Sequence, residues 1–184
     1  MALCGTVAGA YRAAASSGQV ELSASAHHHP ILPLLVDTDA PRGVSAAIAL
    51  PSPPFRAPED ATAQVRRARE SHARRFGAPP RGAWPPEGAV RDAALAILAR
   101  EGFAWVASDE AVLARALRAR DGDLRDWPAA LYRSYEVATG AGPIRMLFRD
   151  RRISDAIGFA FRHWDPKHAA EDFLDRVRRA AATA

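Results

Sequence analysis

The sequence has little cysteine, little lysine and no long apolar run. Cys4 is the single cysteine among 184 residues, so no disulfide can form within the chain, and a reducing compartment is expected. No stretch approaches the ~18 consecutive apolar residues that a membrane helix needs. Residues 1–4 also lack the basic region and long apolar core of a secretory signal. We therefore expect a cytoplasmic protein that does not partner a membrane.

Lys167 is the only lysine, so almost all of the positive charge comes from arginine. A formal net charge of +4 would be compatible with an anionic partner. The arginines alternate with acids, however, as in residues 145–152 and 171–179. A nucleic-acid-binding face concentrates its positive charge instead. We therefore expect no nucleic-acid partner.

Segments with helical and strand-like patterns alternate along the chain, without an internal repeat. The proline-rich residues 37–55 predict a long ordered loop. Strands that alternate with helices of about ten to fifteen residues are typical of βαβ units and a parallel sheet. We therefore expect one α/β domain over residues 1–184. It has helices at 3–15, 58–76, 89–100, 109–120 and 169–181, and strands at 19–25, 103–107 and 144–148.

Two carboxylates lie near points where strands give way to loops, which is where functional residues of such sheets gather. Glu87 follows a tryptophan and two prolines that stiffen the backbone, so it could be catalytic. A glutamate at the start of a helix would have the same local sequence. Asp155 could likewise be catalytic, or it could be an N-cap or first-turn acid of a helix that starts there. Asp150, between two arginines, is expected to be a salt-bridged structural residue.

His27, His28 and His29 form a histidine triplet. On a strand, the first and third would face the same side, and two imidazoles could contribute to a zinc site. A zinc site needs further ligands, and no suitably spaced cysteine or histidine follows. We therefore favour hydrogen bonding to a substrate by His29 over metal binding, and expect no metal and no cofactor.

Two of the four tryptophans precede or follow the candidate carboxylates. Trp84 and Trp164 could each stack an apolar ring face on a sugar. Trp105, within a short apolar strand, is expected in the core.

Several stretches resemble, in the same order, the amylopullulanase-like branch of glycoside hydrolase family 57. The likeness runs from about residue 11 to residue 174 and includes the second, third and fourth conserved regions of that family. The matching stretches are 18–23 (GQVELS), 29–35 (HPILPLL), 58–61 (PEDA), 76–77 (FG), 82–88 (GAWPPEG), 103–110 (FAWVASDE), 148–151 (FRDR) and 153–159 (ISDAIGF).

The resemblance implies a partial (β/α)7 barrel of parallel strands with outer helices, lacking the first strand and the C-terminal part of the catalytic barrel. It also implies a retaining hydrolase or transglycosylase that acts on α-glucans such as starch, glycogen or maltooligosaccharides, without a cofactor. Glu87 is the implied nucleophile and Asp155 the implied acid/base residue. The sequence departs from the family at Pro86, where a serine is usual, and at His27-His28, where an aromatic pair is usual.

The resemblance also implies substrate-binding residues around the catalytic pair. Glu21, His29 and Asp109 are the implied sugar contacts, and Arg149 would modulate the electric field at the carboxylates. Besides an α-glucan, the missing parts of the same enzyme are expected partners. Two alternatives stay open: a catalytically inactive remnant that binds glucan, and a metal-dependent polysaccharide deacetylase, which the histidine triplet suggests.

Overall fold

The computed structural model of the chain describes residues 2–121 and 126–183, with side chains for 5–120 and 126–183. The chain divides into two compact units. The first comprises Met1–Ala107 and Glu136–Arg145, and the second comprises Ser108–Tyr135 and Met146–Ala184.

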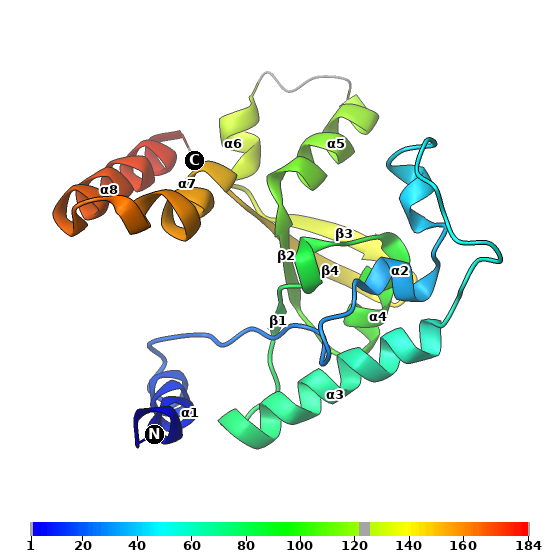
Figure 1. Cartoon of the computed structure of the whole chain (residues 1–184), viewed down its shortest axis with the longest axis horizontal. Coiled ribbons are helices and arrows are strands. Elements are labelled where there is room, and N and C mark those ends of the chain that lie inside the picture. The colour runs from blue at the N-terminus through cyan, green and yellow to red at the C-terminus, as the bar shows by residue number, and fades with distance from the viewer. Residues whose placement is uncertain (1, 122–125, 184) are drawn as a thin grey trace. The chain divides into compact units, whose positions relative to one another are not determined.

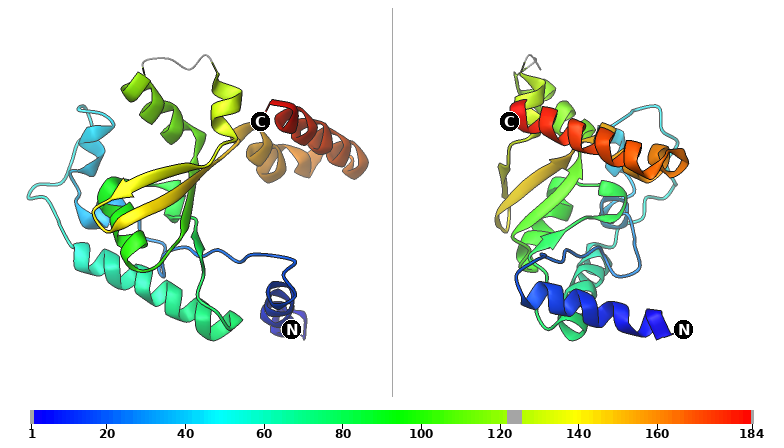
Figure 2. Two further views of the ribbon diagram at one scale, coloured as in Figure 1. Left: turned by 180° about the vertical axis from the view of Figure 1, so that it is seen from behind. Right: turned by 90° about the vertical axis from the view of Figure 1, so that its left-hand side faces the viewer.

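Four strands form a sheet in the order β1-β2-β4-β3 (Figure 1). They are β1 (Gly82–Ala83), β2 (Trp105–Asp109), β3 (Tyr135–Thr139) and β4 (Gly142–Arg149). β1 and β2 are parallel, with Gly82 beside Trp105. Two residues join β3 to β4, a connection that only antiparallel neighbours allow, and they form the yellow hairpin in Figure 2. The strands predicted at 103–107 and 144–148 are confirmed with shifted ends, whereas β3 has no counterpart among the predicted strands.

Residues 19–25, which the sequence predicts as a strand, extend the sheet by a single bridge. Ala24 pairs in parallel with Ala83. The Ala24 N–H donates to the Gly82 carbonyl, and the Trp84 N–H donates to the Ala24 carbonyl, both at 3.0 Å. Further upstream, Val20 is 42% exposed. The apolar alternation therefore buries little there, and the prediction of a full strand is wrong.

Helix α3 (Pro58–Phe76) confirms the helix predicted at 58–76. Pro58 occupies the first turn, where its missing N–H costs nothing. Gly77 ends the helix in the left-handed conformation, with φ 90°, and its N–H donates to the Ala73 carbonyl at 2.9 Å. The helix buries one stripe of small and apolar side chains at helical spacing, namely Ala61, Val65 and Ala68.

Three other helices of the first unit pack against α3: α1 (Ala2–Ser16), α2 (Leu32–Val36) and α4 (Asp92–Arg100). α1 confirms the helix predicted at 3–15. α4 begins at Asp92 instead of Ala89, because Arg91 has an extended backbone. The buried side of α4 consists of Ala94, Leu95, Ile97 and Leu98.

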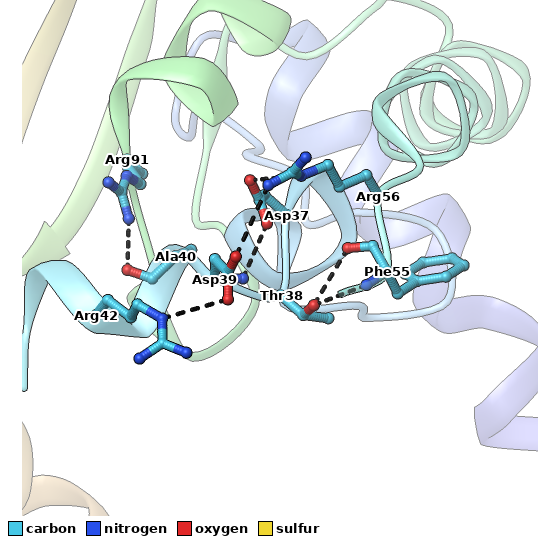
Figure 3. Close-up of polar contacts among 8 residues, drawn as sticks. All are labelled: Asp37, Thr38, Asp39, Ala40, Arg42, Phe55, Arg56 and Arg91. Atoms are coloured by element: carbon cyan, nitrogen blue, oxygen red, sulfur yellow. Dashed lines mark hydrogen bonds and ion pairs between the residues drawn. The ribbon is translucent and has the colours of Figure 1, made fainter. Parts of the chain in front are cut away.

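The proline-rich segment forms the predicted ordered loop, and polar contacts close its base (Figure 3). Thr38 Oγ1 accepts a hydrogen bond from the Phe55 N–H at 2.9 Å and donates to the Phe55 carbonyl at 3.2 Å. Arg56 Nε donates to the Asp37 carboxylate at 2.9 Å. The hydrogen bond from the Asp39 N–H lowers the pKa of Asp37, and the hydrogen bond from Arg56 lowers it further by a smaller amount. The loop, which includes the short helix η1 (Ala40–Gly43), is therefore fixed where it joins the rest of its unit.

The second unit is mainly helical. α8 (Pro166–Thr183) packs against α6 (Trp127–Leu131) and α7 (Arg151–Asp155), and α5 (Glu110–Asp121) also packs against α6. α5 and α8 confirm the predicted helices at 109–120 and 169–181, with small shifts at their ends. No helix within residues 2–121 or 126–183 has the length and apolar character needed to cross a bilayer. The helical elements are α5 (Glu110–Asp121), α6 (Trp127–Leu131), α7 (Arg151–Asp155), η3 (Ala156–Ala160), η4 (Phe161–His163) and α8 (Pro166–Thr183).

Candidate active site

Glu87 projects from a tight, largely buried turn of the first unit. Pro85, Pro86 and Gly88 are buried, whereas the Glu87 side chain is 71% exposed. The Glu87 backbone is left-handed, with φ 57°, a conformation that costs a residue with a Cβ about 1–2 kcal/mol. α4 begins only at Asp92, which holds the acidic position in its first turn. Glu87 is the middle residue of the short 3-10 helix η2 (Pro86–Gly88), but its own backbone is non-helical and it does not begin α4.

His29 has the same unusual backbone, also with φ 57°, and its side chain contacts Glu87. Nε2 of His29 lies 3.3 Å from Oε1 of Glu87. Nδ1 of the same ring lies 3.5 Å from Oγ of Ser25. The bridge between Ala24 and Ala83 holds the two chain segments beside each other. Two non-glycine residues in a disfavoured conformation at one contact are typical of a functional site.

Glu21 and Trp105 form a second contact in the first unit. The indole Nε1 of Trp105 donates to Oε1 of Glu21 at 2.8 Å. Trp105 is only half-buried, so the prediction of a core tryptophan holds in part. Trp84 is also half-buried, and the bridge to Ala24 fixes its backbone. Glu21, a predicted sugar contact, thus already binds an aromatic side chain.

In the second unit, Asp109 pairs with two arginines. Asp109 is the last residue of β2, and Arg149 is the last residue of the neighbouring strand β4. Arg149 Nε donates to Asp109 Oδ2 at 2.9 Å, and Arg151 donates to both oxygens of the same carboxylate. Burial alone would raise the pKa of Asp109, but the bonds from Arg151, the Ala111 N–H and Arg149 outweigh it, so the pKa lies below its usual range. Arg151 is a partner that the sequence did not reveal.

Asp155 lies at the end of α7, with its Oδ1 4.0 Å from Nη1 of Arg149 and its side chain 45% exposed. Asp155 occupies the N-cap position of η3, as the alternative reading expects, but its side chain makes no capping hydrogen bond there. Asp150 caps α7 and accepts from the Ile153 N–H at 3.0 Å. Asp150 also accepts from the Tyr132 hydroxyl at 2.6 Å. Asp150 is thus structural, as predicted, but its partners are a tyrosine and a backbone amide and not the predicted arginine.

Trp164, the last predicted sugar contact, follows the short helix η4 and is 44% exposed. Its ring meets Phe161 edge-on at 5.3 Å between centroids. Part of the Trp164 side chain is therefore accessible to solvent.

A cavity of about 530 Å³ lies in the second unit, and its lining includes Glu110, Trp127, Tyr132 and Asp150. Burial and the neighbouring carboxylates of Asp150 and Asp109 raise the pKa of Glu110. Burial and the hydrogen bond to Asp150 raise the pKa of Tyr132 to about 12. Asp155 is not among the lining residues, so this cavity and the candidate acid/base residue are separate features of the unit.

The histidine triplet does not form a strand. Residues 27 and 28 lie in a turn, so the expected convergence of His27 and His29 does not occur. His28 faces Gln64, with 3.4 Å between Nδ1 and Nε2, whereas His29 faces Glu87. Within the described side chains, no three His, Cys, Asp or Glu residues gather as metal ligands.

Replacing Asp109 by asparagine is expected to lower the free energy of unfolding by about 1 kcal/mol at pH 7, a modest value because both arginines are partly exposed to solvent. Folding lowers the pKa of Asp109 below its usual 3.8. Its stabilising contribution is therefore present above that value and is lost as the pH falls through the folded value. Urea unfolding should thus separate wild type from Asp109→Asn at pH 7 and less at pH 3. Glu136→Gln, on the exposed side of β3, is the matched control.

The sequence model described as Glycosyl hydrolase family 57 matches residues 2–183. Comparison with curated proteins gives no match. Three solved structures have a similar fold. An alpha-amylase from Thermotoga maritima shares 18% identity, with a TM-score of 0.58 over 85% of this chain and 24% of that chain. A 4-alpha-glucanotransferase from Thermococcus litoralis shares 20%, with a TM-score of 0.57 over 83% and 19%. A GH57-type branching enzyme from the hyperthermophilic archaeon Pyrococcus horikoshii shares 21%, with a TM-score of 0.63 over 90% and 28%.

The chain spans about a quarter of the length of these solved structures. At such low identity the likeness concerns the fold, and it confirms the predicted partial (β/α)7 barrel of α/β class. The family model covers the sequence almost from end to end. The chain therefore belongs to glycosyl hydrolase family 57.

Proposed function

We propose that the chain is the central part of a catalytic domain that hydrolyses α-glucans or transfers their glycosyl groups with retention of configuration. The first strand and the C-terminal part of that domain would lie outside these 184 residues. The observation that carries the proposal is the contact between His29 and the strained, exposed Glu87. Glu87 is also the glutamate that family membership makes the candidate nucleophile.

In the proposed reaction, the Glu87 carboxylate attacks the anomeric carbon. Asp155 gives its proton to the glycosidic oxygen as the bond to the leaving sugar breaks, and a covalent glycosyl-enzyme forms. Asp155, now a carboxylate, takes a proton from a water or a sugar hydroxyl, whose oxygen attacks the same carbon and releases Glu87. Two inversions leave the configuration unchanged.

Arg149 has a definite part in this proposal. Arg149 lies 2.9 Å from Asp109 and 4.0 Å from Asp155. In this proposal its positive charge stabilises the Asp155 carboxylate that forms once the proton has passed to the glycosidic oxygen.

The remaining predicted contacts supply sugar binding in this proposal. The partly exposed ring of Trp164 and the half-buried ring of Trp84 suit stacking, and Glu21 has a second carboxylate oxygen besides the one that binds Trp105. The substrate would be an α-glucan of the kind that amylopullulanases act on. The remaining parts of the same enzyme would be the other partner. The single cysteine supports a cytoplasmic location.

The test is to incubate the chain with maltoheptaose and follow the anomeric protons by NMR. Retention predicts that newly formed reducing ends appear first as the α-anomer and then mutarotate. Initial formation of the β-anomer would contradict the mechanism. Binding of maltoheptaose without any product at high protein concentration would instead support the inactive remnant.

A further inference from the structure

Ser25 and Glu87 each lie next to a different ring nitrogen of His29. The imidazole of His29 has one nitrogen on each side of this arrangement: Nδ1 lies 3.5 Å from the Ser25 hydroxyl oxygen, and Nε2 lies 3.3 Å from Oε1 of Glu87. Three side chains thus form a row whose last member is the candidate nucleophile.

The backbone fixes the two ends of this row independently of the side chains. Ser25 directly follows Ala24, whose N–H and carbonyl bond to the chain on either side of Ala83. Glu87 sits in a turn in which the Gly88 N–H donates to the Pro85 carbonyl at 2.8 Å. His29 is held in its left-handed conformation by its N–H, which donates to the Ala26 carbonyl at 3.0 Å. The contacts therefore follow from a defined backbone.

A neutral imidazole carries its proton on only one nitrogen, and the partner of the other nitrogen selects which one. A carboxylate only accepts hydrogen bonds, so Nε2 interacts favourably with Glu87 when it carries the proton. Nδ1 must then accept, and a hydroxyl can donate to it. The Ser25 hydroxyl meets this requirement.

We propose that Ser25 is a positioning residue that, through His29, holds a proton donor against the Glu87 carboxylate. The inference rests on the proposed function of Glu87. The bond from Nε2–H occupies Oε1 and orients the carboxylate, which leaves Oε2 for attack on the anomeric carbon. Without the hydroxyl, His29 divides between two tautomers, and one of them places a lone pair against the carboxylate.

The test reads the tautomer directly. ¹⁵N NMR of the full chain at a pH where the ring is neutral should show His29 protonated on Nε2, with the signal assigned by its loss in His29→Asn. Ser25→Ala should shift His29 towards a tautomer mixture, Ser25→Thr should restore the Nε2–H form, and Ser23→Ala, at an exposed neighbouring residue, should leave it unchanged. Turnover of maltoheptaose should fall about three- to tenfold in kcat in Ser25→Ala, with little change in KM.

Two results would overturn the inference: an Nδ1–H tautomer in the wild-type chain, or a tautomer that is the same in Ser25→Ala and wild type. Both are independent of turnover. An absence of turnover with a Ser25-dependent tautomer would contradict the proposed function alone, whereas turnover with a Ser25-independent tautomer would contradict this inference alone.

Discussion

Glu87→Gln is expected to lower kcat for α-glucan turnover by about a thousandfold or more, because an amide cannot form the covalent glycosyl-enzyme. Glutamine keeps the size of the side chain, and its carbonyl oxygen can still accept from His29, so the turn from Pro85 to Gly88 should persist. Activity is measured with maltoheptaose. An activated 2-fluoro glucosyl substrate followed by mass spectrometry should add a sugar to the Glu87-containing peptide of the wild type only.

The control for this substitution is Glu136→Gln, a change of the same chemistry on an exposed strand position, which should leave kcat unaltered.

Asp155→Asn should behave differently from both Glu87→Gln and Glu136→Gln. It should slow substrates with poor leaving groups strongly, and activated aryl glycosides much less, because a good leaving group departs without protonation. Equal losses for both substrate types in Asp155→Asn, or a glycosylated peptide in Glu87→Gln, would contradict the assignment of roles.

Gly82→Ala is expected to destabilise the first unit by about 3 kcal/mol or more, through overpacking. A Cβ at this position would lie 1.9 Å from Cζ2 and 2.0 Å from Cε2 of Trp105. The indole cannot simply withdraw, because its Nε1 bonds to Glu21 and its backbone pairs with β1. The substitution should therefore separate β1 from β2 or displace the ring, with a large fall in the urea midpoint measured by circular dichroism.

Gly9→Ala is the matched control, since a Cβ there meets nothing within 4 Å. In the interior of α1 it should stabilise by up to about 1 kcal/mol. Trp105→Ala provides a second check. If the clash is the cause, adding Gly82→Ala to Trp105→Ala should cost little further stability. An unchanged urea midpoint in the single variant Gly82→Ala would show that β1 can move away from Trp105 without loss of stability. That result would contradict the prediction drawn from the contact in the structure.

The sequence by itself determined the elements whose signals are local. α3 has a proline in its first turn, a glycine after its last and a helical stripe of small residues between them, and each of these acts within a few residues of chain. β2 and β4 were predictable for the same reason, since each contains a short, mainly apolar segment. β3 was missed although Tyr135, Val137 and Thr139 alternate with Glu136 and Ala138 in a strand-like pattern, because the segment has only five residues and few of them are strongly apolar.

Only the tertiary structure decided what the candidate site residues touch. His29 meets Glu87 across 58 positions of sequence, and Arg149 meets Asp109 across 40. Such contacts leave no local pattern, because they depend on the pairing of segments that are far apart in the sequence. The same holds for Asp150, which caps α7 and accepts from the hydroxyl of Tyr132, 18 positions earlier in the sequence. The chemical identity of the carboxylates was present in the sequence, whereas their partners were fixed by packing.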